Sequence, residues 1–531
     1  MTLLPDGPIQ AQCENATIDA GTLRGDVTTK GGTTRFTARL DDEGRLAGSL
    51  GKGDGAAVGS FVLEPTPDPE QLAGRQRFAG KVALPNGRSF ELAALLACTE
   101  TGRYVVNVDL ATQNAFDIPL VDVRAEAGEG HTRVQATLIG RTDTTLRFDL
   151  DPQSDRLPGT FVQGHVELPF ELARASPDAA GPSRPQHPNP PFPYRSKTVV
   201  ATHPEGHILA GTLTLPDATQ FGSGPYAAVA LVSGSGPQDR DETIMGHKPF
   251  LVLADRLTRA GIAVMRYDDR GVGESTGAAS LPQATTADFA TDTTAVVAQL
   301  RARRDIDGDR IGLVGHSEGG TIALIVAAND PKVAFVTLMA GPCVPGSVVA
   351  SRQIALSAQA DGASTEATER LRSTLARALT LSVAPKTDAA EAAEALTIAA
   401  RSHLEALNAE VTKDRLARAT GNLRGLLARP WDRYFLEHDP TDHLLRIRCP
   451  ILALNGTKDL AVWHEDNLGA LRRLAGHREN VEIVALPGLN HLFQPCETGR
   501  QDEYASIETT IDEKVLDTIV RWVTTVTRRQ R

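Results

Sequence analysis

One ten-residue stretch, residues 311–320, constrains the fold of this chain more than any other. It reads IGLVGHSEGG, an apolar run that enters a Gly-X-Ser-X-Gly pentapeptide, and small and apolar residues follow as far as 328. This order predicts a strand, a sharp turn at Ser317 and a helix. Gly315 and Gly319 would let strand and helix approach closely, because a Cβ at either position would block the contact. The pentapeptide alone is common by chance, but this context makes Ser317 the candidate nucleophile.

Length and composition bound the remaining possibilities. At 531 residues the chain is too long for one ordinary domain and predicts two to four. A hydrophobic content of 41% is sufficient for packed cores, and the net charge of -11 is spread along the chain. No basic cluster predicts binding to nucleic acid, and no apolar run reaches the roughly 20 residues that span a bilayer. We therefore expect neither a nucleic-acid partner nor a membrane span, whereas a homo-oligomer stays open.

The five cysteines give no structural framework. They are scattered, odd in number and without metal-ligand spacing, at Cys13, Cys98, Cys343, Cys449 and Cys496. This pattern predicts neither a set of disulfides nor a zinc site, although one pair could bridge. The first residues lack the basic and apolar regions of a signal peptide, and a leader removed beforehand would leave the same picture. The compartment, cytoplasmic or exported, stays open.

Residues 1–174 have the pattern of an all-β accessory domain. Short alternating runs, such as residues 35–40, 45–50 and 146–150, are separated by Gly- and Asp-rich turns. This period of two predicts antiparallel hairpins, arranged as meander units in a small sandwich or barrel. Residues 175–195 follow and are too rich in proline for a helix or an inner strand, so they predict an extended linker.

From residue 196 onward, predicted strands alternate with predicted helices. Such alternation indicates the α/β class, a mainly parallel sheet with helices on both faces. The alternation stops at residues 346–440, which are rich in Ala, Glu and Leu with helical periodicity. We interpret this segment as a helical cap inserted into a catalytic domain made of residues 196–345 and 441–531, because large insertions at strand ends usually shape a site. The alternative is a set of helices packed on the outer face of the sheet.

A serine nucleophile needs a base to take its proton and an acid to orient that base. With this type of serine turn, the acid and then the histidine follow the serine in sequence, each at the end of a strand. The strand expected at residues 451–456 is followed by Asp459, and the one expected at 481–486 is followed by His491. We predict Asp459 as the orienting acid and His491 as the base. Asp466 and Glu465 are rivals for the acid but are better placed to start a helix.

The negative oxygen of a tetrahedral intermediate needs two N–H donors. We expect one from the backbone of Glu318, directly after the nucleophile, and one from the glycine-rich loop at residues 233–237, at Ser235. The alternative interpretation of that loop is a flexible turn. No glycine pattern predicts a nucleotide cofactor, and His203 with His207 offers too few ligands for a metal. We expect no cofactor and no metal.

Several of these stretches together resemble a known group of proteins. The chain is similar to α/β-hydrolase carboxylesterases related to prolyl-oligopeptidase and serine-aminopeptidase-like hydrolases. The matching stretches are residues 233–242, 266–276, 315–320, 431–436, 450–459 and 489–493, which cover the chain from about 200 to 530. Residues 114–120 and the LPGTF stretch at 157–161 look more weakly like a β-rich extension that some bacterial members carry.

The resemblance implies an α/β-hydrolase fold and hydrolysis of short-acyl esters by Ser317, Asp459 and His491 without a cofactor. The chain departs from many relatives at Ser233, where they have histidine, but backbone donors would survive this change. Asp269 and Arg270 match a loop that is structural in such enzymes.

We therefore interpret the chain as a serine carboxylesterase that acts on small-molecule esters through an acyl-enzyme. A serine peptidase or amidase would use the same residues but would need a pocket for a peptide terminus. A thioesterase or acyltransferase differs only in the leaving group or the acceptor. A fourth possibility is that residues 1–174 bind a surface or a glycan, although that region has few of the aromatic side chains such binding usually needs.

Overall fold

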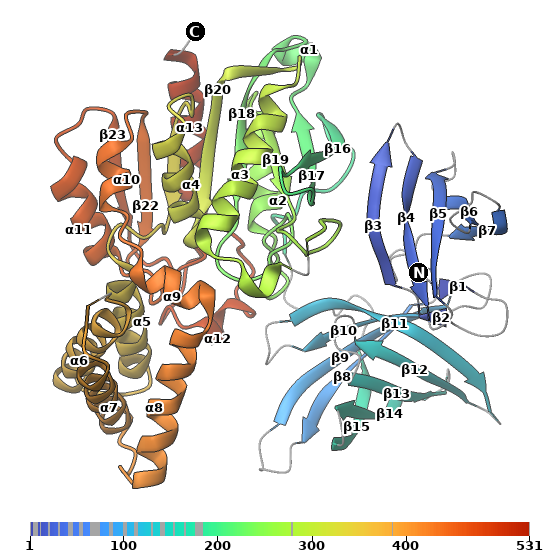
Figure 1. Ribbon diagram of the computed structural model, residues 1–531, viewed down its shortest axis with the longest axis horizontal. Coiled ribbons are helices and arrows are strands. Elements are labelled where there is room, and N and C mark those ends of the chain that lie inside the picture. The colour runs from blue at the N-terminus through green and yellow to red at the C-terminus, as the bar shows by residue number, and fades with distance from the viewer. Residues whose placement is uncertain are drawn as a thin grey trace. The chain divides into compact units, whose positions relative to one another are not determined.

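The structure is a computed structural model of the chain. It describes the backbone of the strands between residues 2 and 63, and residues 75–529 apart from gaps at 84–88, 99–103, 111–114, 129–130, 139–143, 152–153, 164–165, 176–183, 278–279 and 385. The chain divides into two compact units, Met1–Ala180 and Gly181–Arg531. Each unit is described by itself below (Figure 1).

The regular elements described in the first unit are all strands. A short pair, β1 (Thr2–Leu3) and β2 (Ile9–Gln10), precedes a five-stranded antiparallel sheet of β3 (Gln12–Asp19), β4 (Thr22–Thr29), β5 (Gly32–Leu40), β6 (Leu46–Gly51) and β7 (Ala57–Leu63). Eight further antiparallel strands close into a barrel: β8 (Gln76–Ala83), β9 (Ser89–Cys98), β10 (Tyr104–Leu110), β11 (Ala115–Ala127), β12 (Thr132–Leu138), β13 (Thr144–Leu150), β14 (Arg156–Gln163) and β15 (Val166–Ala175). The β-rich character predicted for this region is confirmed.

Alternation of side chains explains why the eight strands close around a core. In β13 the side chains of Leu146 and Phe148 are fully buried, while Arg147 between them is exposed. Two pairs of aromatic rings meet edge to face inside, Phe90 with Phe161 at 5.3 Å and Phe148 with Phe170 at 5.9 Å. The described interior is thus filled with side chains, as in small barrels that enclose no ligand.

The stretch that the sequence predicts as a linker, residues 175–195, is described from Arg184 onward. Arg184 donates hydrogen bonds to the carbonyl oxygens of Met245, Ala505 and Ile507, at 2.9, 2.9 and 2.6 Å. Gln186 adds a bond from its side-chain nitrogen to the carbonyl oxygen of Ile511, at 2.7 Å. These contacts hold residues 184–194 against the rest of the second unit. The segment then continues into the first strand of that unit.

The second unit is built on an eight-stranded sheet in the order β16-β17-β19-β18-β20-β21-β22-β23. The strands are β16 (Arg195–Thr202), β17 (Ile208–Leu215), β18 (Tyr226–Val232), β19 (Ala263–Tyr267), β20 (Ile306–His316), β21 (Val336–Met339), β22 (Ile451–Gly456) and β23 (Val481–Leu486). The first two are antiparallel to their neighbours and the others run parallel. Every residue of β18 and β22 is buried, as expected for strands covered on both faces.

Helices cover both faces of this sheet, each over its own apolar cluster. One face carries α3 (Thr286–Arg301), α4 (Glu318–Asn329), α10 (Thr441–Arg446) and α11 (His464–Ala475), and the other carries α2 (Pro249–Arg259) and α13 (Glu513–Arg529). Shorter turns are α1 (Ala218–Phe221), η3 (Leu281–Gln283) and α12 (Gln501–Tyr504). The α/β class and the doubly covered sheet predicted from the alternation are confirmed.

Between β21 and β22, five consecutive helices precede α10: α5 (Gly346–Ala360), α6 (Thr365–Val383), α7 (Ala389–Ala406), α8 (Lys413–Ala428) and α9 (Pro430–Glu437). Side-chain caps start two of them, because Ser364 accepts from the N–H of Ala367 and Asp388 from that of Ala390. These helices share a small core of their own and gather beyond one end of the strands (Figure 1). Among the described residues, every helix is too short or too polar to cross a lipid bilayer.

Candidate active site

The turn at Ser317 joins β20 to α4 as the sequence predicts. Ser317 has φ 53° and ψ -122°, a strained backbone for a residue with a side chain. A Cβ on Gly315 would lie 2.1 Å from the carbonyl oxygen of Gly319, and a Cβ on Gly319 would lie 2.0 Å from that of Val232. Strand and helix are therefore in backbone contact, and the turn holds Ser317 above the end of the sheet.

Asp459 and His491 come together from the ends of β22 and β23. The Nδ1 atom of His491 lies 2.8 Å from Oδ2 of Asp459, which is 0% exposed. The other carboxylate oxygen of Asp459 accepts the backbone N–H groups of Ala461 and Val462, both at 2.8 Å. A carboxylate with three donors keeps a fixed orientation, so it holds the imidazole with Nδ1 protonated and Nε2 free to accept a proton.

The ring of His491 lies beside the nucleophile turn. Its centre is 4.8 Å from that of His316, the residue that precedes Ser317. The rival acids of the sequence analysis lie elsewhere: Glu465 and Asp466 are in the first turn of α11, and Asp466 pairs with Arg352 at 2.7 Å. The structure therefore brings Ser317, His491 and Asp459 to one end of the sheet and leaves both rivals outside the cluster.

The loop after β18, residues 233–237, lies directly against Ser317. A Cβ on Gly234 would be 3.2 Å from the Cβ of Ser317, so only glycine fits there without displacement. Ser235 is exposed on this loop, and its hydroxyl contacts the carboxylate of Glu318. The N–H of Glu318 is the first of α4 and has no acceptor within the helix. The two predicted donors, the N–H groups of Ser235 and Glu318, thus belong to adjoining segments.

The side chain of Glu318 is buried and joins three parts of the site. Its Oε1 atom accepts from the hydroxyl of Thr286 at 2.6 Å and from the indole N–H of Trp431 at 2.8 Å. Burial raises the pKa of Glu318, whereas the hydrogen bonds from Thr286, Trp431 and Ser235 lower it in part. Through Trp431, helix α9 is tied to the residue that follows the nucleophile.

A second buried pair, Glu242 and His316, lies beneath the nucleophile and was not anticipated. Oε1 of Glu242 accepts the N–H of Gly234 at 2.7 Å and lies 2.9 Å from Nδ1 of His316. Nε2 of His316 donates to the carbonyl oxygen of His491 at 3.0 Å. Burial lowers the pKa of His316, but the Glu242 carboxylate, the carbonyl group of His491 and the charge of Asp459 together raise it overall. The pair links the loop after β18, the nucleophile strand and the loop that carries His491.

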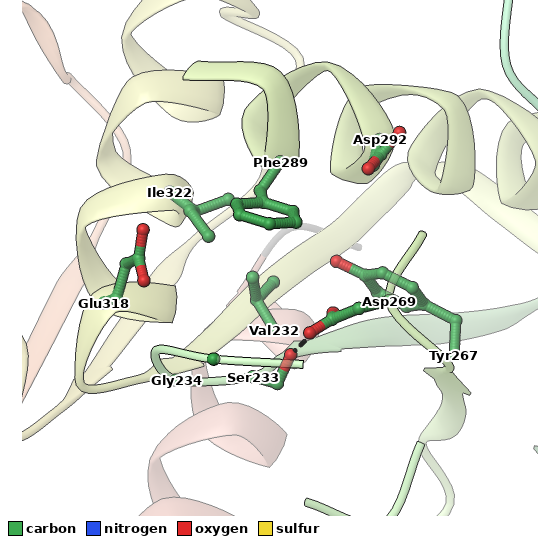
Figure 2. Close-up of a pocket in the computed structure, with 10 residues that line it drawn as sticks. Val232, Ser233, Gly234, Tyr267, Asp269, Phe289, Asp292, Glu318 and Ile322 are labelled. Atoms are coloured by element: carbon green, nitrogen blue, oxygen red, sulfur yellow. Dashed lines mark hydrogen bonds between the residues drawn. The ribbon is translucent and has the colours of Figure 1, made fainter. Parts of the chain in front are cut away.

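Asp269 also stabilises the loop after β18. Its carboxylate accepts from the hydroxyl of Ser233 at 2.9 Å and from the N–H of Gln238 at 3.0 Å, and Figure 2 shows the first of these bonds. Burial raises the pKa of Asp269 to about 8, although both hydrogen bonds oppose the shift. Figure 2 also shows a small cavity here, lined by residues that include Tyr267, Phe289, Asp292 and Ile322. The contacts of Asp269 agree with the structural role that the resemblance implies.

His203, His207 and Asp292 have ligand atoms within 4.8 Å of one another. Both oxygens of Asp292, however, accept from the guanidinium of Arg270, at 2.6 and 2.9 Å. His207 approaches one of these oxygens at 2.7 Å. Because a guanidinium cation already occupies the carboxylate and would repel a metal ion, we interpret the group as an ion pair with two stacked histidines.

Comparison with known proteins agrees with this geometry. Residues 248–494 match the family described as serine aminopeptidase, S33. Esterase EstD of Thermotoga maritima is 30% identical over 319 residues, which cover 59% of this chain and 65% of the esterase. The match thus spans less than two thirds of that relative.

Solved structures also align, at low similarity. An esterase of Pyrococcus furiosus, Pf2001, is 15% identical with a TM-score of 0.38, over 66% of this chain and 98% of the esterase. The α/β hydrolase GrgF of Penicillium sp. sh18 is 18% identical with a TM-score of 0.38, over 63% and 98%. These scores are too low to bear on function. The sheet order and the serine turn show an α/β-hydrolase fold in the second unit, and its sequence is similar to the S33 serine aminopeptidases and to Esterase EstD.

Proposed function

We propose that the protein is a serine carboxylesterase whose triad is Ser317, His491 and Asp459. The observation that carries the proposal is the 2.8 Å contact between His491 and the fully buried Asp459, beside a strained serine turn. Esterase EstD, named for ester hydrolysis, supports the same reaction class. The chemistry needs no cofactor, because the serine is activated by the histidine alone.

In the first step Ser317 Oγ attacks the carbonyl carbon of the ester while Nε2 of His491 takes its proton. Asp459 stabilises the imidazolium that forms. The negative oxygen of the tetrahedral intermediate is bound by the N–H groups of Ser235 and Glu318. His491 then protonates the alkoxide, the alcohol leaves, and an acyl group stays on Ser317. Water, deprotonated by His491, releases the carboxylic acid in the second half of the cycle.

The test compares wild type with Ser317→Ala on p-nitrophenyl acetate and butyrate. We expect kcat to fall by a factor on the order of 10⁴ or more, as in other serine hydrolases that lose the nucleophile. A fluorophosphonate that labels the wild type, but not the variant, would locate the reactive hydroxyl. Ester hydrolysis that survives the substitution would refute the assignment of Ser317.

The family description favours a second candidate, a serine aminopeptidase or amidase with the same triad. An aminoacyl-p-nitroanilide assayed beside the esters separates the two, since anilide cleavage that exceeds ester cleavage would assign the protein to the peptidases. A thioesterase differs only in its leaving group and is tested with an acyl thioester. The resemblance implies short acyl groups, and p-nitrophenyl esters of increasing acyl length measure the preference.

A further inference from the structure

The cap helices line a partly open cavity of about 480 Å³. Its walls are mainly apolar and come from α5, α6, α7 and α9, with Ala350, Ile354, His403, Leu407, Trp431 and Phe435 among them. Sites for small organic molecules have volumes of about 300–1,000 Å³ and mainly apolar walls. The cavity is therefore large enough for a ligand well beyond an acetyl group.

The charges in these walls are already paired. Asp361 lies 2.6 Å from Arg500, and Asp432 accepts from Arg429 at 2.9 Å. Burial lowers the pKa of His403, so its imidazole is neutral at neutral pH. Among the described lining residues, both carboxylates thus face an arginine, and none of the lining side chains is a lysine or an arginine. These walls suit an uncharged, apolar group.

Trp431 connects the cavity to the nucleophile turn. The Trp431 ring stacks on Phe435 with centres 5.4 Å apart, and both rings line the cavity. The indole N–H of Trp431 donates to Glu318, which directly follows Ser317. A side chain that lines the cavity thus donates a hydrogen bond to the residue whose backbone N–H is the proposed oxyanion donor.

We propose that this cavity binds the acyl chain of the substrate, so that the preferred esters carry acyl chains longer than butyryl. The proposal rests on the esterase function proposed above. Each additional buried CH₂ can raise kcat/KM by up to about fourfold, if its transfer free energy is realised in the transition state. We expect kcat/KM to rise from acetate through butyrate to octanoate.

The experiment measures kcat/KM of the full chain for p-nitrophenyl acetate, butyrate, octanoate and decanoate. Ala350→Phe places a ring in the cavity and should lower the octanoate-to-acetate ratio by at least about tenfold. Leu407→Trp, at a partly exposed wall position, is a second variant that should lower the same ratio. Ala360→Phe, an exposed site on the same helix α5 and outside the cavity, is the matched control and should keep the wild-type ratio. A wild-type ratio below one, or ratios unaffected by both filling variants, would overturn the proposal.

A binding measurement separates failure of the cavity from failure of the esterase function. Octan-1-ol, an uncharged probe, is titrated against Ser317→Ala with tryptophan fluorescence as the readout. We expect saturable binding that Ala350→Phe weakens at least tenfold. Binding of this kind without any ester hydrolysis by the wild type would refute the esterase and keep the cavity as an apolar site. Hydrolysis that depends on Ser317, with neither octanol binding nor a rise beyond butyrate, would keep the esterase and refute the cavity.

Discussion

Glu242 and His316 show how single side chains hold the site together. Glu242 is 4% and His316 5% exposed, and their hydrogen bonds reach the loop after β18 and the carbonyl of His491. A carbonyl oxygen can only accept, so Nε2 of His316 carries a proton. The raised pKa of His316 then favours a buried ion pair in which both ring nitrogens donate. We interpret both as positioning residues.

Glu242→Gln keeps the shape of residue 242 but removes its charge. We expect kcat for p-nitrophenyl butyrate to fall about 10²-fold with little change in KM, because Gly234 and His491 lose their shared anchor and shift relative to Ser317. Steady-state kinetics measures kcat and KM separately. Glu205→Gln, an exposed carboxyl-to-amide change, is the control and should leave both constants unchanged.

A merely structural role for Glu242 would lower stability and leave the kcat of the folded fraction intact. Titration of active sites with a fluorophosphonate therefore accompanies the kinetics. If kcat per titrated site equals that of the wild type, the positioning role is wrong.

Asp269 makes stability depend on pH in an unusual direction. Burial raises its pKa to about 8, while an aspartate in an unfolded chain has a pKa of about 3.9. Between these values the folded state binds one more proton, so this group's contribution to the free energy of unfolding falls as pH rises from about 4 to about 8. In Asp269→Asn the contribution is absent.

We therefore expect the difference in unfolding free energy, wild type minus Asp269→Asn, to decrease between about pH 5 and about pH 8. Urea denaturation at three pH values across this range measures it. A difference that stays constant, or that grows with pH, would show that Asp269 is ionised throughout.

Sequence order was sufficient to predict Ser317, Asp459 and His491 as a cluster, because strand ends in a parallel sheet meet at one edge. It could not identify Glu242, whose contact with His316 spans 74 positions and begins in an irregular loop. Trp431 was included in a matching stretch, yet its bond to Glu318 depends on how α9 packs. Such contacts are set by tertiary packing and leave no periodic signal.

At the scale of elements, the contact between the start of α4 and the end of β18 decides whether the nucleophile turn can form. Gly319→Ala would place a Cβ 2.0 Å from the carbonyl oxygen of Val232 and 2.6 Å from that of Ser233. Neither backbone atom can move without shifting β18, so we expect a loss of stability above the usual ~1–3 kcal/mol of overpacking, and loss of activity. Thermal unfolding followed by circular dichroism measures the first effect.

The control is a glycine inside helix α8 that has open space around it. A Cβ on Gly421 meets nothing within 4 Å, so Gly421→Ala should be neutral or stabilising by about 0.5–1 kcal/mol. Equal Tm values for Gly319→Ala and Gly421→Ala would show that the strand and helix can separate at no cost.

Periodicity predicted the elements better than it predicted their contacts. Helices α5 to α9 follow from the Ala- and Leu-rich pattern, and they lie within the range 346–440 interpreted as a cap. Proline content correctly argued against a helix or strand at residues 184–194 but gave no sign that this segment is held by carbonyl groups of the second unit. Backbone carbonyls are the same in every sequence, so such partners cannot be read from residue types.

At the scale of the whole molecule, the described residues of the two units do not share an apolar core. The barrel of the first unit encloses its own apolar cluster, and the sheet of the second unit carries a cluster on each face. Units with separate cores can unfold separately, so we expect two transitions in scanning calorimetry. Fluorophosphonate bound at Ser317 should raise the Tm of one transition only. A single transition that shifts as a whole would show that the units unfold together.

The segment 184–194 also limits how this chain can be recombined during evolution. A crossover near residue 181 exchanges the β-rich partner and keeps Arg184 and Gln186 with the residues that they hold at 505–511. A crossover at residue 196, where the α/β pattern starts, would leave those carbonyl groups without their donors. The segment that has to be inherited in one piece therefore begins before residue 196, where the α/β pattern starts. Homologues with other N-terminal domains should retain an arginine and a glutamine just ahead of their first strand.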